Sequence, residues 1–190
     1  SDIVKEYIKE KYNKPGNVFL GVAHRLDRPT TGIIVFARTS KALERFNKML
    51  RDKEVHKTYW AVVKNKPKDL QNTLIGYLRK NPKNNKSTSY SSEIEGGKKA
   101  ILHYKLLKSL DNYHLLEVDL ETGRHHQIRC QLSAIGSPIK GDLKYGFDRS
   151  NKDASIHLHA RKIEFVHPVT KEEISIIAPT PNEVIWNACN

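Results

Sequence analysis

The succession of short alternating segments and turn signals is the feature that most constrains how this chain can fold. Apolar alternation and apolar runs predict strands at 32–38, 56–64, 99–108, 112–119, 155–165 and 172–178. Asp111 and Asn112 supply a turn signal between two of these strands. Antiparallel hairpins with a few short helices between them predict an α+β domain with a largely antiparallel sheet.

Helical spacing of apolar residues predicts three helices between the strands. The first begins at Asp2 and ends near Asn13, and the second is capped by Thr39 or Ser40. The third opens at 122–123 and stops before Gly136; its core side chains are predicted to be Ile128, Leu132 and Ile135. These helices are short, which fits elements that flank a sheet.

The composition bounds the domain organisation. A chain of 190 residues with 38% hydrophobic residues is long enough for one globular domain, and we expect a single domain over residues 1–190. Residues 81–99 are rich in Asn, Lys, Ser and Gly and cannot bury enough apolar area to pack alone. We expect a projecting hairpin or a mobile loop there.

The charge of the chain points to a polyanionic partner. The formal net charge is +12, and residues 57–108 alone carry 12 Lys or Arg against three acids. Such a field raises the local concentration of polyanions and favours nucleic acid over a small neutral substrate. No apolar run approaches the ~18 residues of a membrane span, and no signal-peptide pattern opens the chain. We therefore expect a cytoplasmic protein without a membrane partner.

Cysteines and histidines give little support to a metal site. Cys130 and Cys189 are far apart and fit neither a disulfide framework nor paired metal-ligand spacing. His125-His126 and His157-x-His159 lack helical i, i+4 spacing and a neighbouring cysteine pair. We expect reduced thiols, structural histidines and no metal.

One carboxylate is placed in an unusual setting. Asp27 stands between Arg25 and Arg28, just before an apolar run, where Pro29 and Gly32 force a turn. Nearby positive charge favours the ionised form of a carboxylate, so Asp27 is a candidate nucleophile. A surface turn with incidental ion pairs is the alternative that these residues alone leave open.

Three separated segments form a pattern in order along the chain: His24-Arg25-Leu26-Asp27 with Thr30-Thr31-Gly32, Lys57-Thr58-Tyr59-Trp60-Ala61-Val62, and Thr122-Gly123-Arg124-His125-His126-Gln127-Ile128-Arg129. Together they resemble the RluA-type pseudouridine synthases. The segments Gly136-Ser137-Pro138-Ile139-Lys140-Gly141-Asp142 with Tyr145-Gly146, and His157-Leu158-His159-Ala160, reinforce the match. The family has a Ser where Thr31 stands, which is a conservative difference.

The resemblance implies an isomerase that converts specific uridines in ribosomal or transfer RNA to pseudouridine. Uracil is detached from C1′, rotated and rejoined through carbon, without a cofactor and after the base has been flipped out of its stack. The implied fold is the pseudouridine synthase catalytic domain, with structured RNA as partner and a monomer as the expected state. The family domain begins upstream of this sequence, so we expect the N-terminus to be truncated and the first strand to be missing.

The resemblance also assigns roles to individual residues. Asp27 aligns with the catalytic carboxylate, Tyr59 with the aromatic residue that stacks on the target uracil, and Arg129 with the arginine that pairs with the carboxylate. Arg25 aligns with the residue that fills the place of the flipped base, and Ile139 with an aliphatic wall. The remaining expected substrate contacts are His24, Arg28, Thr31, Gly32, Gly123, Arg124 and Gln127.

The physical logic of this set predicts one geometry and leaves two alternatives. A fixed carboxylate beside C1′ can stabilise or trap developing positive charge, and stacking on an aromatic ring is worth ~1–3 kcal/mol per base. We expect the Asp27 carboxylate and the Arg129 guanidinium within roughly 2.7–3.5 Å, with Tyr59 and Ile139 lining the same cleft and Arg25 at its rim. An RNA-binding module without activity and a nucleoside hydrolase remain alternatives. A serine hydrolase is disfavoured because no Gly-x-Ser-x-Gly occurs.

Overall fold

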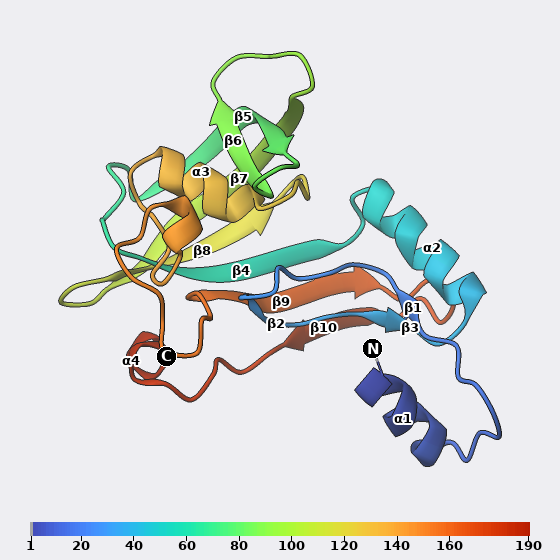
Figure 1. Cartoon of the computed structure of the whole chain (residues 1–190). Coiled ribbons are helices and arrows are strands. Elements are labelled where there is room, and N and C mark those ends of the chain that lie inside the picture. The colour runs from blue at the N-terminus through green and yellow to red at the C-terminus, as the bar shows by residue number, and fades with distance from the viewer. Residues whose placement is uncertain (1) are drawn as a thin grey trace. The chain divides into compact units, whose positions relative to one another are not determined.

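The computed structural model describes residues 2–190, which form two compact units that we describe separately (Figure 1). Unit 1 comprises the residues up to Leu26, Ile34–Val55 and Phe165–Ile174. Unit 2 comprises Asp27–Ile33, His56–Glu164 and Ser175–Asn190. In the part of the chain that the structure describes, no helix is both long and apolar enough to cross a membrane.

Unit 1 is built from two helices and a small two-stranded sheet. Its elements are α1 (Asp2–Lys11), β1 (Gly21–Val22), β3 (Phe36–Ala37) and α2 (Ser40–Arg51), and β1 pairs antiparallel with β3. The Thr39 hydroxyl accepts the Ala42 N–H at 3.1 Å, which confirms the predicted cap of the second helix. Phe46 of α2 packs edge-on against Phe165, with ring centroids 5.2 Å apart.

Unit 2 contains most of a large sheet. Its strand order is β10-β9-β4-β8-β7-β5-β6, and β2 adds to β9 as a parallel pair, whereas the pairs β4–β8, β4–β9, β5–β6, β5–β7 and β7–β8 are antiparallel. The strands are β2 (Thr31–Gly32), β4 (His56–Val63), β5 (Gln71–Asn81), β6 (Lys86–Tyr90), β7 (Lys98–Ser109), β8 (His114–Leu120), β9 (Leu158–Val166) and β10 (Glu173–Ile177). The last residues of β9 and the first of β10 are counted with unit 1. The predicted α+β class with a largely antiparallel sheet is confirmed.

Short helices cover both faces of the sheet in unit 2. On one face, α3 (Gln127–Ala134) and the 3₁₀ turn η1 (Leu143–Tyr145) bring Cys130 and Tyr145 against Leu78 and Ala100. On the other face, α4 (Val184–Cys189) brings Trp186 and Cys189 against Val62 and Leu115. Neighbouring residues of a strand point to opposite faces, so Tyr59 lies on the α3 face and Thr58 on the α4 face.

Two predicted boundaries are wrong for local reasons. The predicted strand 32–38 is instead two short strands, because Thr31 and Gly32 pair with β9 while Phe36 and Ala37 pair with β1. The predicted third helix begins at Gln127 rather than near 123, because His126 has a left-handed backbone with φ 53°. Residues 122–126 therefore form a loop in front of α3.

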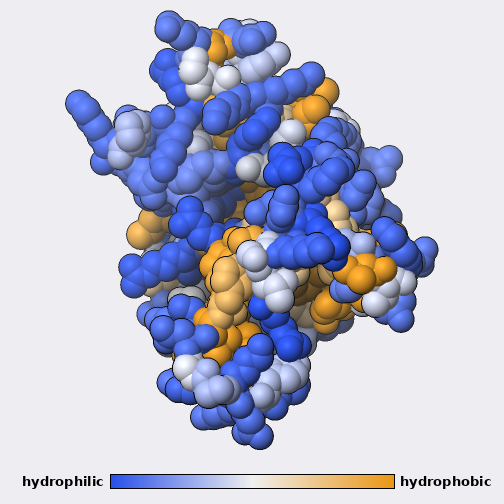
Figure 2. All heavy atoms as spheres, turned by 90° about the vertical axis from the view of Figure 1, so that its right-hand side faces the viewer, coloured by the Kyte–Doolittle hydropathy of each residue, from blue (hydrophilic) through white to orange (hydrophobic). Residues whose placement is uncertain are grey.

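The short elements β1 and η1 and the longer elements β5 and α4 carry no prediction from the sequence. Strand β5 was missed, although its partner β6 falls within the segment for which a hairpin or mobile loop is expected. Helix α4 at the end of the chain was missed as well; Glu183 caps it by accepting the N–H groups of Ile185 and Trp186. Figure 2 shows that hydrophilic residues dominate the visible surface, with apolar residues interspersed, as the charged composition requires.

Candidate active site

The Asp27 carboxylate lies at a turn that opens unit 2. The backbone carbonyl of Asp27 accepts the Thr30 N–H at 2.8 Å, which closes the turn around Pro29 before β2 begins. The side chain of Asp27 is 29% exposed. Its Oδ2 atom accepts a hydrogen bond from Nη1 of Arg129 at 3.2 Å, so the contact predicted between these two distant residues is confirmed.

Arg129 is held rigidly from behind by a second carboxylate. Its Nε and Nη2 donate to Oδ2 and Oδ1 of Asp142 at 2.7 and 2.8 Å, a bidentate pair in which Asp142 is almost completely buried. Burial acts to lower the pKa of Arg129, but the hydrogen bonds and charges of Asp142 and Asp27 outweigh it and raise this pKa. The guanidinium therefore presents Nη1 to Asp27 as a fixed cation.

Tyr59 lies on the α3 face of the sheet, close enough to Asp27 for the charge of this carboxylate to affect its pKa. The residue is only 9% exposed on β4. Burial, and then the negative charge of Asp27, raise the pKa of Tyr59 to about 12. Its hydroxyl therefore stays protonated at neutral pH, and Tyr59 can offer a ring surface and a hydrogen-bond donor but no base.

A second polar network meets Asp27 from the start of α3. His126 places Nε2 at 3.7 Å from Oδ2 of Asp27 and Nδ1 at 2.9 Å from the Tyr145 hydroxyl. The Ser87 N–H donates to this same hydroxyl at 2.8 Å. His125 stacks on His126 with ring centroids 3.8 Å apart.

Asp142, His126 and Tyr145 are residues that the sequence reasoning missed as parts of the site. The segment from Gly141 to Gly146 served only to support the resemblance, and the histidine pair was considered only as metal ligands. The available signal was that Asp142, His126 and Tyr145 all lie within the segments that carry the resemblance.

Thr31 and Gly32 hold the Asp27 turn onto β9. The Thr31 hydroxyl lies 2.8 Å from Nδ1 of His159, and the Ile33 N–H donates to the Ala160 carbonyl at 3.0 Å. Gly32 has φ +112°, and a Cβ on it would lie 2.4 Å from the Ala160 carbonyl oxygen. The close approach to the β9 backbone explains why position 32 needs glycine. The predicted role of Thr31 and Gly32 as substrate contacts stays a prediction.

Gly123, Arg124 and Gln127 form the loop in front of α3. The Gln127 side-chain oxygen accepts from the Thr122 hydroxyl and the Arg124 N–H, and its amide nitrogen donates to the Ile101 carbonyl at 3.0 Å. The buried Gln127 amide is thus occupied in holding the loop. Gly123 and Arg124 are exposed, with the Arg124 Nε donating to the Lys99 carbonyl at 2.9 Å.

The expectation that Ile139 lines an open cleft is wrong. Ile139 has 0% exposure and forms an isolated bridge to Val63 beside β4. Backbone bonds on both sides, from Lys64 to Pro138 and from Lys140 to Val62, fix it in the interior of unit 2. Its aliphatic side chain supports the sheet from within.

The residues around Asp27 in the sequence divide between the two units. His24 and Arg25 belong to unit 1, where Nε2 of His24 accepts the Val35 N–H at 3.1 Å and Arg25 is exposed. Arg28 is exposed in unit 2. Within unit 2, the residues that the structure describes pair Asp27 with Arg129, as predicted, and with His126, and not with its sequence neighbour Arg28.

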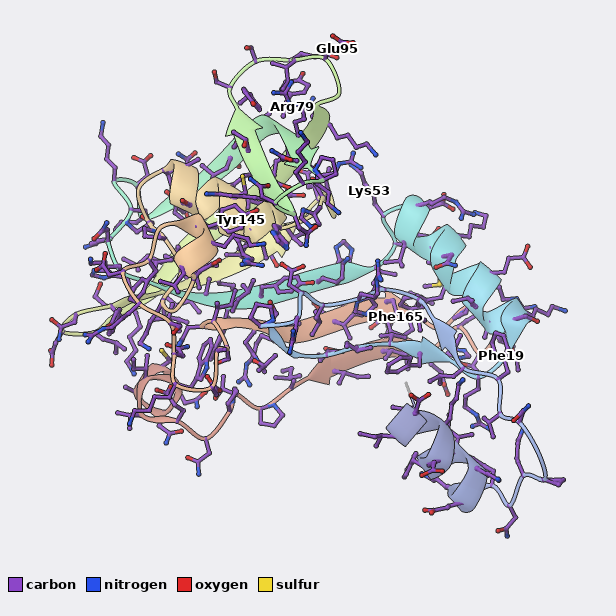
Figure 3. All side chains as sticks on the ribbon, viewed as in Figure 1. Phe19, Lys53, Arg79, Glu95, Tyr145 and Phe165 are labelled. Carbon is purple, nitrogen blue, oxygen red and sulfur yellow. The ribbon has the colours of Figure 1, made fainter. Side chains whose placement is uncertain are left out.

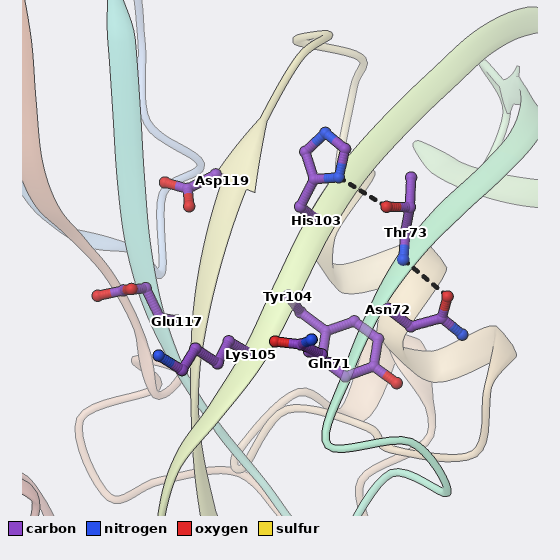
Figure 4. A pocket seen from close by; sticks show the side chains of 8 residues that line it. All are labelled: Gln71, Asn72, Thr73, His103, Tyr104, Lys105, Glu117 and Asp119. Atoms are coloured by element: carbon purple, nitrogen blue, oxygen red, sulfur yellow. Dashed lines mark hydrogen bonds between the residues drawn. The ribbon is translucent and has the colours of Figure 1, made fainter.

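A separate hollow of about 440 Å³ lies on the opposite face of the sheet (Figure 4). Its carboxylate Asp119 accepts from the Thr58 hydroxyl at 2.6 Å, and His103 bonds to Thr73 and Glu121. Cross-strand pairing places Thr58, Asp119, His103 and Thr73 in one row, away from Tyr59. The hollow is lined by Gln71, Asn72, Thr73, His103, Tyr104, Lys105, Glu117 and Asp119.

A basic hairpin stands beside α3. Residues 79–90, from the end of β5 to the end of β6, contain four Lys or Arg and no acid. In Figure 3, Arg79 lies at the open end of this hairpin, where it contacts Tyr90, and Tyr145 lies beside α3. Lys86 places its Nζ 5.3 Å from the centre of the Tyr145 ring, so β6 connects the hairpin to the Asp27 network.

The cysteines are buried, and the histidines at 157 and 159 have partners other than a metal ion. Cys130 and Cys189 are free and buried, as expected. His159 bonds to Thr31, and Nε2 of His157 lies 2.9 Å from Glu183. Over residues 2–190 there is no group of three or more His, Cys, Asp and Glu side chains able to hold a metal ion.

An antiparallel sheet with a partly exposed Asp, a buried Arg and a buried Tyr on one face defines a carboxylate-centred site. The model of the family described as RNA pseudouridylate synthase matches residues 2–134. The chain belongs to this family, and it is of the RluA type. The fold and the motif residues agree with that placement.

The relatives agree with the family model. The chain is 37% identical over 164 residues to a protein of Synechocystis sp. named an uncharacterized RNA pseudouridine synthase, covering 85% of this chain and 50% of that protein. It is 31% identical over 172 residues to ribosomal large subunit pseudouridine synthase D of Zymomonas mobilis, covering 86% and 54%. The chain spans about half the length of the curated relatives it matches.

A solved structure shows the same fold. The human RNA pseudouridylate synthase domain containing 4 aligns with a TM-score of 0.81 at 22% identity, over 99% of this chain and 81% of that one. At this identity the likeness concerns the fold alone.

Proposed function

We propose that this chain isomerises uridine to pseudouridine in RNA and that Asp27 is the group that attacks the nucleoside. The observation that carries the proposal is the Asp27–Arg129–Asp142 arrangement: a partly exposed carboxylate bound by a buried arginine that a second carboxylate fixes. Because Asp27 is 29% exposed at the end of this buried chain of charges, a substrate can reach its carboxylate, which supports a functional role for the arrangement.

The reaction needs only groups that this site can supply. The N1–C1′ bond breaks, a C5–C1′ bond forms, the proton on C5 leaves, and N1 gains a proton, so the product is an isomer of the substrate. Asp27 stabilises or traps the charge that develops at C1′, and Arg129 holds the carboxylate in place. Tyr59 contacts the base with its ring or its protonated hydroxyl and can assist the proton transfer.

RNA is the partner that the charge distribution supports. The hairpin lysines beside the site would bind phosphates, and the target uridine must leave its stack to reach Asp27. Arg25 is the residue we propose to occupy the place of the flipped base. Ribosomal RNA is the first substrate to test, because several relatives are named ribosomal large subunit pseudouridine synthase D, and transfer RNA is the second.

The test uses RNA labelled with tritium at C5 of uridine. Isomerisation releases the label into water and leaves pseudouridine in the chain, hydrolysis releases free uracil, and a pure binding module gives neither. We expect Asp27→Asn to abolish label release and to keep RNA affinity within about twofold, because phosphate contacts remain. Asp111→Asn, in the exposed turn between β7 and β8, is the matched control with the same charge change. Label release by Asp27→Asn above about a hundredth of the wild-type rate contradicts the proposed role.

A further inference from the structure

His126 has an unusual, left-handed backbone conformation. Its φ of 53° is left-handed, which is uncommon for a residue other than glycine, and the residue is 9% exposed. Such conformations persist where the surroundings fix them and occur often at functional sites. The conformation turns the ring between Asp27 on one side and Tyr145 on the other.

The contacts of Tyr145 and Asp27 bear on which ring nitrogen of His126 carries the proton. The hydroxyl oxygen of Tyr145 accepts the Ser87 N–H at 2.8 Å, and its one proton is then free to be donated to Nδ1 of His126 at 2.9 Å. Because Nε2 faces the negative charge of Asp27, we infer that Nδ1 accepts this proton and that the neutral ring carries its own proton on Nε2. Burial lowers the pKa of His126 to about 4, against the opposing charge of Asp27, so the ring is neutral at physiological pH.

Arg129 and His126 face the same oxygen of the Asp27 carboxylate. Nη1 of Arg129 and Nε2 of His126 lie 3.2 and 3.7 Å from Oδ2. Within unit 2, both of these contacts are made to Oδ2, and neither is made to Oδ1. The two oxygens are thereby made different, with one held by the protein and the other left for a substrate.

We propose that His126 is a positioning residue: its tautomer, set by Tyr145, donates Nε2–H to Oδ2 of Asp27 and leaves Oδ1 as the reacting atom. The inference rests on the proposed function of Asp27. The His126–Asp27 distance shortens into hydrogen-bond range when RNA fills the site, because catalytic contacts tighten in the complex. The hydrogen-bond chain starts at the backbone of Ser87 on β6, so the strand that carries Lys86 also fixes the reacting carboxylate.

A purely structural role for His126 predicts different results. If the residue only packed under the loop before α3, its tautomer would be irrelevant, and a variant that folds would keep full turnover. If it positions Asp27, loss of the N–H donor lowers kcat with little change in KM or in RNA affinity, because the ring is buried and offers little surface for a phosphate contact.

The test combines a spectrum of the wild-type protein with three variants. Nitrogen-15 NMR of the histidine rings should show His126 as the Nε2–H tautomer, and Tyr145→Phe should shift it toward a mixture. We expect kcat for tritium release to fall roughly tenfold in Tyr145→Phe and up to a hundredfold in His126→Leu, since small misplacements of a reacting group cost this much. His126→Gln, which keeps an N–H near the position of Nε2, should recover part of the loss.

Tyr104→Phe is the matched control, because it removes a hydroxyl that bonds only to the Asp69 carbonyl among the residues described. A wild-type spectrum with the proton on Nδ1 overturns the proposal even if every variant misfolds. Wild-type kcat in both His126→Leu and Tyr145→Phe overturns it as well. If Asp27→Asn is inactive while these variants are fully active, only this inference fails; if Asp27→Asn is active, the proposed function fails.

Discussion

Replacing Arg129 by methionine tests whether the buried ion pair between Arg129 and Asp142 positions the Asp27 carboxylate. The Asp142 side chain is 1% exposed and would lose both of its charged hydrogen bonds. Removing one partner of a buried ion pair costs about 3–5 kcal/mol, because the other charge stays buried without compensation. Total stabilities are typically 5–15 kcal/mol, so Arg129→Met should still fold but with a greatly reduced free energy of unfolding.

The double variant Arg129→Met/Asp142→Leu separates stability from function. It removes both buried charges and fills their place with apolar side chains, which is often neutral or stabilising. Asp27, at 29% exposure, loses one hydrogen bond that water can partly replace. We expect the free energy of unfolding to return to within about 2 kcal/mol of the wild type, while tritium release stays lost because no guanidinium holds Asp27.

Urea unfolding followed by tryptophan fluorescence measures this change in the correct part of the protein, because both tryptophans, Trp60 and Trp186, lie in unit 2. An unchanged dependence on urea would show that the surface exposed on unfolding is the same in each variant. A double variant as unstable as Arg129→Met alone would refute the reasoning, because the uncompensated charge of Asp142 could not then be the source of the loss.

Three further predictions concern residues of unit 2. Gly32→Ala should lower the free energy of unfolding by more than about 2 kcal/mol in urea titrations, because its Cβ would meet the β9 backbone at 2.4 Å; an unchanged midpoint would contradict this. Replacing Lys80, Lys83 and Lys86 by Gln should reduce the slope of log affinity for RNA against log salt by about 2–3, and an unchanged slope would show that the hairpin does not contact RNA. Acidification from pH 6.5 toward 4 should lower the free energy of unfolding by up to about 3 kcal/mol through His126, because the unfolded chain takes up the proton first; a melting temperature equal at pH 7.5 and 5 would refute it.

The sequence predicted the strands that have regular alternation and clear turn signals. Residues 56–64 became β4 and residues 112–119 became most of β8, because each buries one or both faces in unit 2. The contact between Asp27 and Arg129 followed from aligned motifs, since no local pattern links residues this far apart. The residues next to Asp27 in the sequence, taken alone, predict ion pairs with Arg25 and Arg28 instead.

Strand β5 was missed because its sequence does not show a buried face. The strand includes Gly76 at its centre, and its α4-side residue Ile75 is 61% exposed. Pairing with β6 and β7 holds it in place, and a side chain at Gly76 would come within 2.9 Å of the Tyr90 carbonyl of β6. The glycine that lowers strand propensity therefore permits the close approach of β6.

The sequence could not predict the protonation and the hydrogen-bond partners of the side chains in the site. His126 has the same name and spacing whether it binds a metal, fills space or donates a hydrogen bond, and only the Tyr145 hydroxyl and the Ser87 N–H select among these roles. These partners come from η1 and β6, which are distant from α3 along the chain. A motif can therefore point to the carboxylate, but the oxygen available to react is set by which donors the fold brings to the other one.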